Sequence, residues 1–124
     1  MMRLTLALHR ARRLAGQQTA VIFGERRRSW SEFVDRVARL ATVLRDHGLR
    51  DDGRVAMLAH SSDRYLEFFF ATLWAGGIAV PVSTRYALPE TEFLLSDSGA
   101  GILLVDDDFA GQVPELRRRV PGLH

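Results

Sequence analysis

Three short apolar runs at nearly equal intervals constrain the fold of this 124-residue chain more than any other feature. They cover residues 54–59, 78–82 and 101–105, so successive runs begin about 24 residues apart. Residues 63–75 and 89–96, which fill the intervals, have helical character. Parallel strands need a crossover of about a dozen or more residues, usually a helix, and such crossovers are right-handed. The pattern therefore predicts an α/β fold with a Rossmann-like parallel sheet and flanking helices.

The segment before these runs predicts a β-hairpin followed by a helix. Two short runs, residues 19–23 and 27–30, flank a Gly-Glu turn signal. Ser29 and Glu32 have the spacing of a capping box, in which each side chain bonds the backbone N–H of the other residue. Apolar residues then recur at helical spacing until a glycine ends the pattern, which predicts a helix over residues 31–47.

The first 24 residues contain four arginines and no acidic residue. An organelle transit peptide has this composition, and so does an amphipathic helix that docks on a domain. We favour the N-terminal helix. No apolar run approaches the roughly 20 residues of a membrane span, and the absence of cysteine fits a reducing compartment. We therefore expect a cytoplasmic protein without a membrane span.

Residues 63–75 predict a helix that is apolar on almost every side. Its few polar residues are Asp63, Arg64, Glu67 and Thr72. A helix of this kind is buried on most sides, yet a single sheet covers only one of its faces. We therefore expect the second face to be covered by another copy of the chain, in a homo-oligomer, or by later parts of a longer protein.

The charged residues exclude several classes of chemistry. All seventeen basic residues are arginines, so mechanisms that need a lysine, such as a phosphate-loop cation or a Schiff base, are impossible within this chain. The formal net charge is only +2. The arginines fall into short groups without aromatic or amide readers between them, which is typical of a solvated surface and not of a nucleic-acid interface.

Several consecutive segments carry a resemblance to a known family. They are Thr19–Phe33, the helix ending at His47–Leu49, Asp52–Leu58, Tyr65–Val82, Thr84–Tyr86 and Leu94–Ala100, followed by the run ending at Val105–Asp106. Each segment alone is only a packing pattern and is not specific to one family. Their order and gapless spacing, however, hold over roughly a hundred residues, from about position 7 to 106. The chain resembles the start of the adenylate-forming family of AMP-dependent synthetases and ligases, and in particular an AMP-forming acyl-CoA synthetase.

The resemblance implies that residues 1–124 are a truncated N-terminal portion of the large N-terminal domain of such a ligase. The complete enzyme would activate a carboxylic acid, expected to be a fatty acid, with MgATP to an acyl-adenylate and then transfer the acyl group to coenzyme A. The family's phosphate loop with its lysine, its Tyr-Gly-x-Thr-Glu segment and its C-terminal-domain lysine do not occur in this sequence. We therefore expect the chain alone to be inactive, to bind no cofactor, and to have the remainder of the parent enzyme as its partner.

No catalytic or metal-binding residue is expected in the chain, and two positions are candidates for the edge of a pocket. His60 follows the first apolar run and Arg85 follows the second. Ligands approach parallel sheets at the carboxyl ends of the strands. For His60 an ordinary loop position is the favoured interpretation. Arg85 could meet a phosphate or carboxylate, but a salt bridge to Glu90 or Glu92 is favoured.

Two other interpretations concern the acidic run after the third apolar run and the chain as a whole. The acidic run at residues 106–108 resembles the strand end of a response-regulator receiver, where carboxylates hold magnesium, but the chain has no lysine for that chemistry, so a solvated loop is expected. The second interpretation concerns the whole chain. A free-standing Rossmann-like binding or interaction module, without catalysis, becomes serious if the native gene stops after His124.

Overall fold

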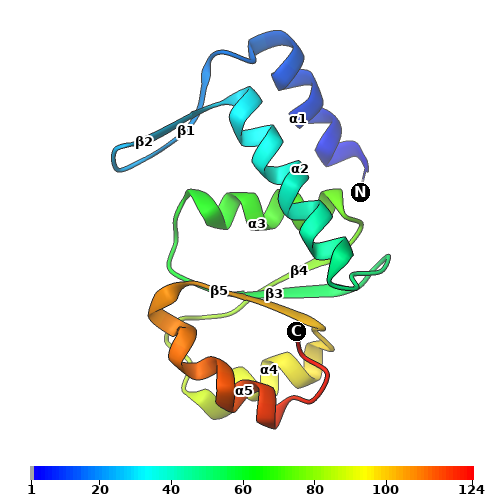
Figure 1. Cartoon of the computed structure of the whole chain (residues 1–124), viewed down its shortest axis with the longest axis vertical. Coiled ribbons are helices and arrows are strands. Elements are labelled where there is room, and N and C mark those ends of the chain that lie inside the picture. The colour runs from blue at the N-terminus through cyan, green and yellow to red at the C-terminus, as the bar shows by residue number, and fades with distance from the viewer. Residues whose placement is uncertain (1) are drawn as a thin grey trace.

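A computed structural model describes residues 2–124, with side chains from Leu4 onward. In chain order the elements are α1 (Met2–Ala15), β1 (Thr19–Phe23), β2 (Arg26–Ser29), α2 (Trp30–Asp46), β3 (Arg54–Leu58), α3 (Asp63–Trp74), β4 (Ile78–Pro81), α4 (Leu88–Ser98), β5 (Ile102–Val105), the 3-10 helix η1 (Asp107–Gln112) and α5 (Val113–Arg119). Figure 1 shows helices on both sides of a small central sheet. Within the described residues, no helix combines the length and apolar character needed to cross a bilayer.

The central sheet has the strand order β4-β3-β5, and all its strands are parallel. Successive side chains of β3 point to opposite faces, as in any strand. Val55 and Met57 pack into a core shared with α2 and α3, whereas Ala56 and Leu58 pack into a core shared with α4 and α5. The predicted α/β fold with three parallel strands and flanking helices is therefore confirmed.

The N-terminal hairpin and the helix after it also form as predicted. Strands β1 and β2 pair antiparallel. Ser29 is the N-cap of α2: its Oγ accepts a hydrogen bond from the Glu32 N–H (3.1 Å), and the Glu32 carboxylate accepts one from the Ser29 N–H (2.9 Å). The N-terminal helix α1 is amphipathic, since Thr5 and Leu8 are buried while most of its other residues are exposed.

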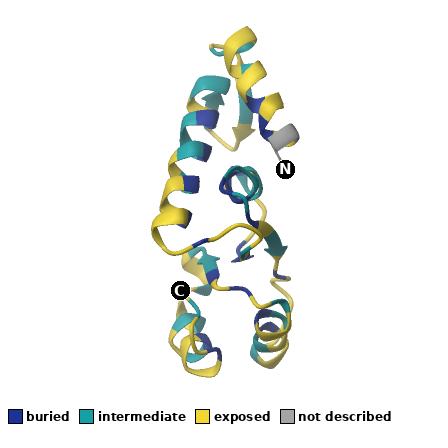
Figure 2. Ribbon diagram, turned by 90° about the vertical axis from the view of Figure 1, so that its right-hand side faces the viewer, coloured by how far each residue is buried: buried dark blue, intermediate teal, exposed yellow. Residues whose placement is uncertain are grey.

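Helix α3 lies between the sheet and the helices α1 and α2 (Figure 2). Phe68 is fully buried, and the ring of Phe70 meets Phe33 of α2 edge-on with 6.0 Å between centroids. On the side of α1, the His9 ring lies 4.6 Å from the Trp74 ring. Helices α1 and α2 of the same chain thus cover part of the second face of this helix, but Leu66 is 44% exposed and Phe69, Phe70 and Trp74 are only partly buried. Association through the apolar side chains of α3 that stay exposed, or through an uncovered face of the sheet, stays a prediction.

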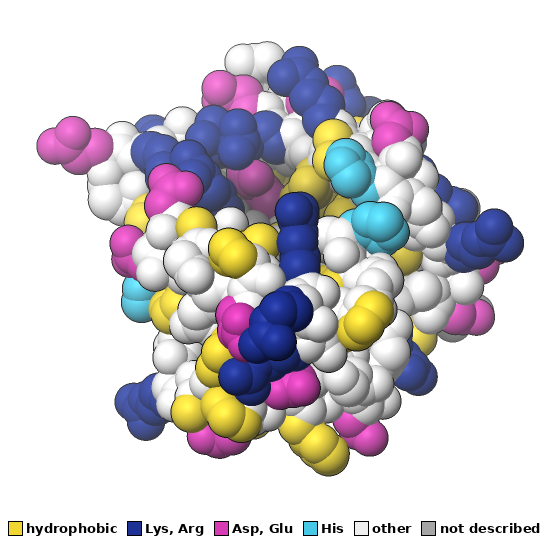
Figure 3. All heavy atoms as spheres, turned by 60° about the horizontal axis from the view of Figure 1, so that its bottom comes forward, with side chains coloured by type: hydrophobic (Ala, Val, Ile, Leu, Met, Phe, Trp, Pro, Cys, Tyr) yellow, Lys and Arg dark blue, Asp and Glu magenta, His cyan; other side chains and the backbone are white. Residues whose placement is uncertain are grey.

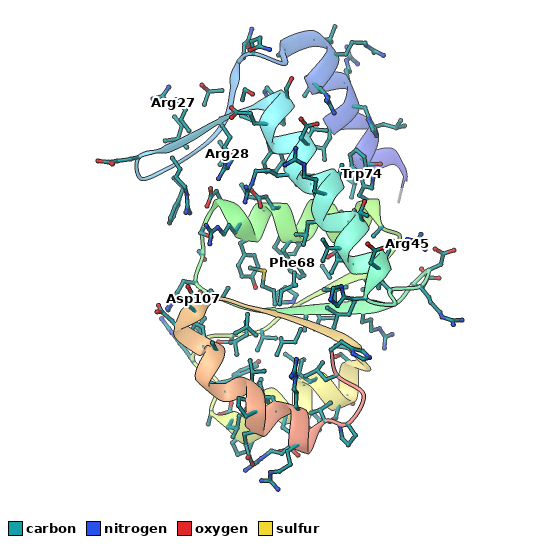
Figure 4. The ribbon with its side chains drawn as sticks, in the orientation of Figure 1. Arg27, Arg28, Arg45, Phe68, Trp74 and Asp107 are labelled. Carbon is teal, nitrogen blue, oxygen red and sulfur yellow. The ribbon has the colours of Figure 1, made fainter. Side chains whose placement is uncertain are left out.

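Two acidic side chains of α3 are buried beneath arginines from β2 and α2. Asp63 is 3% exposed and Glu67 is 5% exposed. Arg36 donates from Nε (2.5 Å) and Nη2 (3.1 Å) to the two carboxylate oxygens of Glu67, and this hydrogen bonding raises the pKa of Arg36. Arg26 donates to Asp63 (2.6 Å), and Arg28 lies within 3.9 Å of both acids. Figure 4 shows Arg28 directed from the hairpin toward α3. We call these five residues the buried ion cluster.

Breaking the buried ion cluster should destabilise the fold strongly. We expect Glu67→Gln to lower the free energy of unfolding by about 2 kcal/mol, because the buried carboxylate is lost while the Arg36 side chain, which is 36% exposed, is partly screened by solvent. Urea unfolding followed by circular dichroism measures this loss.

A matched control is the exposed pair of Arg45 and Asp51, 3.1 Å apart, in which the Asp51 side chain is 85% exposed. Asp51→Asn should cost less than about 1 kcal/mol, since solvent screens surface pairs. If both substitutions lower the free energy of unfolding equally, burial does not strengthen the interactions of the cluster.

A second set of charges joins α4 to α5. Glu115 accepts hydrogen bonds from Arg118 and Arg119, and Arg119 also donates to Glu92 of α4 (3.1 Å). Figure 3 shows basic and acidic side chains next to each other on this side of the molecule, with hydrophobic side chains scattered between them. The hydrogen bonds from Arg118 and then Arg119 lower the pKa of Glu115 to about 2.

The lowered pKa of Glu115 makes part of the free energy of unfolding depend on pH in the acid range. Because the pKa of Glu115 falls from 4.5 to about 2 on folding, its stabilising effect is fully present above the unfolded value and is lost as the pH falls through the range between them. We therefore expect Glu115→Gln to lower the midpoint of thermal unfolding at neutral pH. The difference from the parent chain should shrink as the pH approaches about 2. A difference in unfolding midpoint that stays constant from neutral pH to about pH 2 would contradict the attribution of this stability to the Glu115 carboxylate.

Candidate functional site

Three loops meet at one edge of the parallel sheet, where β3, β4 and β5 end. Residues 59–62 follow β3, residues 82–87 follow β4, and residues 106–108 follow β5. Because the strands are parallel, their carboxyl ends lie at the same edge, the position at which open α/β sheets bind ligands. Two hollows with volumes of about 400 and 560 Å³ open between these loops. This edge is the candidate site.

His60 lies at the border of both hollows. Its backbone N–H donates to the Asp106 carboxylate (2.8 Å), its Nε2 lies 3.1 Å from Asp108 Oδ2, and its ring lies 4.9 Å from the Phe109 ring. These contacts fasten the loop after β3 to the loop after β5. The structure thus places His60 at the edge of a pocket, and a role in binding stays a prediction.

Arg85 is exposed and lines neither hollow. The predicted salt bridge is wrong, since among the described residues Arg85 pairs with neither acid. The physical reason lies in α4. Glu90 occupies the first turn, where its carboxylate accepts the N–H of Ala87 (3.2 Å), and Glu92 pairs with Arg119 of α5.

The acidic run after β5 is more structured than a solvated loop. Asp107 and Asp108 are exposed as expected, and Figure 4 shows Asp107 where β5 ends. Asp106 is half-buried, however, and caps η1 by accepting the N–H of Asp108 (3.0 Å) as well as that of His60. The solvated interpretation is therefore wrong for Asp106. Within the part of the chain that the structure describes, no three potential ligands are grouped to hold a metal ion.

Two residues of the hairpin, Phe23 and Arg26, also line the 400 Å³ hollow. No local sequence signal brings them there. Arg26 is held by its hydrogen bond to Asp63, 37 positions away. A partial signal did exist: Asp63 and Glu67 are four residues apart on an otherwise apolar helix and follow an arginine-rich hairpin, a pattern that indicates buried ion pairs.

The other polar side chains at this edge can contact a ligand, but they do not form a catalytic arrangement. Ser61, Ser62 and Arg64 bring hydroxyls and a cation to the 400 Å³ hollow, opposite three aspartates. Tyr65 lines the other hollow, and burial raises the pKa of its phenol, which therefore stays protonated at neutral pH. Among the described residues of this edge, no hydroxyl is hydrogen-bonded to a histidine or carboxylate that could activate it.

Comparisons with known proteins agree with this fold. The family model described as AMP-binding enzyme matches residues 8–122. A feruloyl-CoA synthase from Amycolatopsis sp is 39% identical over 107 residues, which are 86% of this chain and 22% of that protein. A solved structure of a putative long-chain-fatty-acid CoA ligase from Rhodopseudomonas palustris CGA009 superimposes with a TM-score of 0.90 at 25% identity, over 97% of this chain and 30% of that one.

A fatty acyl CoA synthetase from Mycobacterium tuberculosis gives a TM-score of 0.87 at 25% identity, over 95% of this chain and 24% of that one. The chain therefore spans between about a fifth and a third of the length of these relatives. The family model covers nearly all of the chain, and the fold of the chain superimposes on a part of each solved ligase. The chain belongs to the AMP-binding enzyme family of adenylate-forming ligases.

Proposed function

We propose that residues 1–124 form the N-terminal portion of the large N-terminal domain of an AMP-forming acid-thiol ligase, an acyl-CoA synthetase. The family match over residues 8–122 carries this proposal. The chain spans only 22% of the feruloyl-CoA synthase that it resembles, so the activity belongs to a longer protein. A cytoplasmic location is part of the same proposal.

In the complete enzyme, a carboxylic acid would react with ATP to give an acyl-adenylate and pyrophosphate, and the thiol of coenzyme A would then displace AMP. The names of the similar proteins support two different classes of carboxylic acid. Two solved neighbours are named for fatty acids, in line with the expectation of a fatty acid, whereas the relative at 39% identity is named for the aromatic feruloyl group. The proposal is therefore a ligase for an acyl or aryl carboxylic acid.

The residues present in this chain do not fit MgATP by themselves. At the candidate edge, the Arg26 guanidinium is already hydrogen-bonded to Asp63, and three aspartates at 106–108 oppose a polyphosphate. No lysine is available to neutralise the charge that develops on the phosphates. We infer that this portion supplies the sheet and one wall of the site, and that the rest of the ligase supplies the phosphate chemistry.

This division of labour predicts that the chain of residues 1–124 alone releases no pyrophosphate from ATP with any carboxylic acid. Stabilisation of the phosphate charge typically supplies several kcal/mol of the barrier reduction, and its donors are missing here. A coupled pyrophosphate assay measures the rate, with the complete ligase as the positive control. Activity above the enzyme-free blank that follows the chain through repeated purification would contradict the prediction, and an inactive complete protein would overturn the proposed function.

The second candidate, a free-standing binding or interaction module, is favoured by one observation. The second face of α3 is partly covered by α1 and α2 of the same chain, so the described residues close much of their own core. Such a module would have to bind its nucleotide or partner through residues 1–124 alone. A portion of a ligase would instead need the remainder of the enzyme to bind its substrates.

A further inference from the structure

The N-terminal helix α1 keeps one side exposed, although its other side is docked on the domain. Leu8 is buried, and the helix packs against α2 and α3. Leu4, Leu6 and Leu14, in contrast, are 54%, 58% and 65% exposed. Three of the four exposed leucines among residues 4–124 therefore lie on this one helix. A single exposed leucine is normal in a protein, whereas a group of them on one helix marks an interaction surface.

The exposed side of α1 combines an apolar line with arginines. Small and large apolar residues recur along it at intervals of three and four: Leu4, Ala7, Ala11 and Leu14. Leu6, Arg10 and Arg13 follow the neighbouring line of the helix at intervals of four and three. All of these residues are exposed except the half-buried Ala11. Figure 2 shows α1 at one end of the molecule, exposed along most of its length. We call these seven residues the outer face of α1.

The charge of α1 decides which partner fits its outer face. No acidic residue occurs before Glu25 in the chain. Arg12 is paired with Asp35 of α2 (2.8 Å), whereas Arg10 and Arg13 form no ion pair with any side chain that the structure describes. A second copy of α1 on this face would bring like charges together, which disfavours self-association. An anionic partner would neutralise them instead.

The shape and composition of the outer face favour a lipid surface as that partner. Helices that lie in the plane of a membrane interface combine exposed leucines with arginines, and anionic lipids attract them. The outer face is the convex surface of a single helix, and no residue of α1 lines either hollow of the candidate site. A tightly bound protein partner typically inserts its anchor side chains into pockets. A membrane requires no such pocket.

We propose that the outer face of α1 binds the surface of an anionic phospholipid membrane. The helix would lie parallel to the membrane, with its exposed leucines among the lipid chains and the guanidinium groups of Arg10 and Arg13 at the headgroup phosphates. The buried side of α1 would stay docked on α2 and α3, so the chain is held on the membrane without crossing it. This inference goes beyond the proposed function and does not depend on it.

Sedimentation of the 124-residue chain with lipid vesicles tests the proposal. Vesicles of phosphatidylcholine alone are compared with vesicles in which about one quarter of the lipid is phosphatidylglycerol. The unaltered chain should bind the anionic vesicles at least about tenfold more tightly than the neutral ones. Added salt should weaken this binding, because it screens the attraction between arginines and headgroups.

Two double variants separate the apolar contribution from the charged one. Leu6→Gln with Leu14→Gln removes two exposed apolar side chains, and Arg10→Gln with Arg13→Gln removes two unpaired charges. Each double variant should weaken binding to the anionic vesicles by at least about tenfold. Because the substituted side chains are exposed, the circular dichroism spectrum and the thermal unfolding midpoint should stay close to those of the unaltered chain.

A matched control changes the same kinds of residue on the other side of the sheet. Phe93 of α4 is 70% exposed and Arg117 of α5 is exposed, and Figure 1 shows both helices on the side of the sheet opposite to α1. Phe93→Gln with Arg117→Gln should leave vesicle binding unchanged. Losses as large as those of the α1 variants would show that α1 is not the contact surface.

Three further results would overturn the proposal. The first is a lack of binding to the anionic vesicles by the unaltered chain. The second is full binding by the leucine double variant, which would reduce the interaction to adventitious attraction between arginines and lipid. The third is a dimer, detected by light scattering, that Leu6→Gln with Leu14→Gln dissociates while the chain binds no vesicles, because this would assign the outer face to a second copy of the chain.

Discussion

The arrangement of this chain depends on two carboxylates that α3 carries into a buried position. Asp63 and Glu67 lie one helical turn apart and are at most 5% exposed, so each needs a counter-charge from another element. Arg26 and Arg28 come from β2, and Arg36 comes from α2. The pairing therefore sets where the hairpin and α2 can lie relative to α3, and through α3 relative to the sheet.

The same constraint builds the candidate site. Asp63 is the first residue of α3, directly after the loop that follows β3, and its hydrogen bond to Arg26 brings the hairpin to the carboxyl edge of the sheet. His60 then joins this loop to the loop after β5 through Asp106. The result is a wall with hydroxyls, arginines and aspartates, in which Arg26 is paired with Asp63 and His60 lies 3.1 Å from Asp108. Such a wall can shape a ligand site, and in the proposed ligase the groups for phosphate activation would come from the remainder of the protein.

Patterns within one element could be predicted from the sequence, whereas contacts between distant elements could not. Apolar periodicity placed the three parallel strands and α2, and the short-range pairing of Ser29 with Glu32 identified the start of that helix. Arg36 and Glu67 are 31 positions apart, so nothing local predicts their bond. The partial cover that α1 and α2 give to α3 is not predictable for the same reason, and Arg85 does not pair with Glu92 because Glu92 meets Arg119 from α5 instead.

The central claim is that residues 1–124 form a structural portion of an adenylate-forming ligase without a nucleotide site of their own. Isothermal titration calorimetry of the purified chain with MgATP tests it most directly, with the complete ligase titrated under the same conditions. The account predicts saturable binding to the complete ligase and no saturable heat with the chain alone, even at millimolar nucleotide. Saturable binding of one nucleotide to the isolated chain with a Kd in the micromolar range would contradict the account and favour a free-standing binding module.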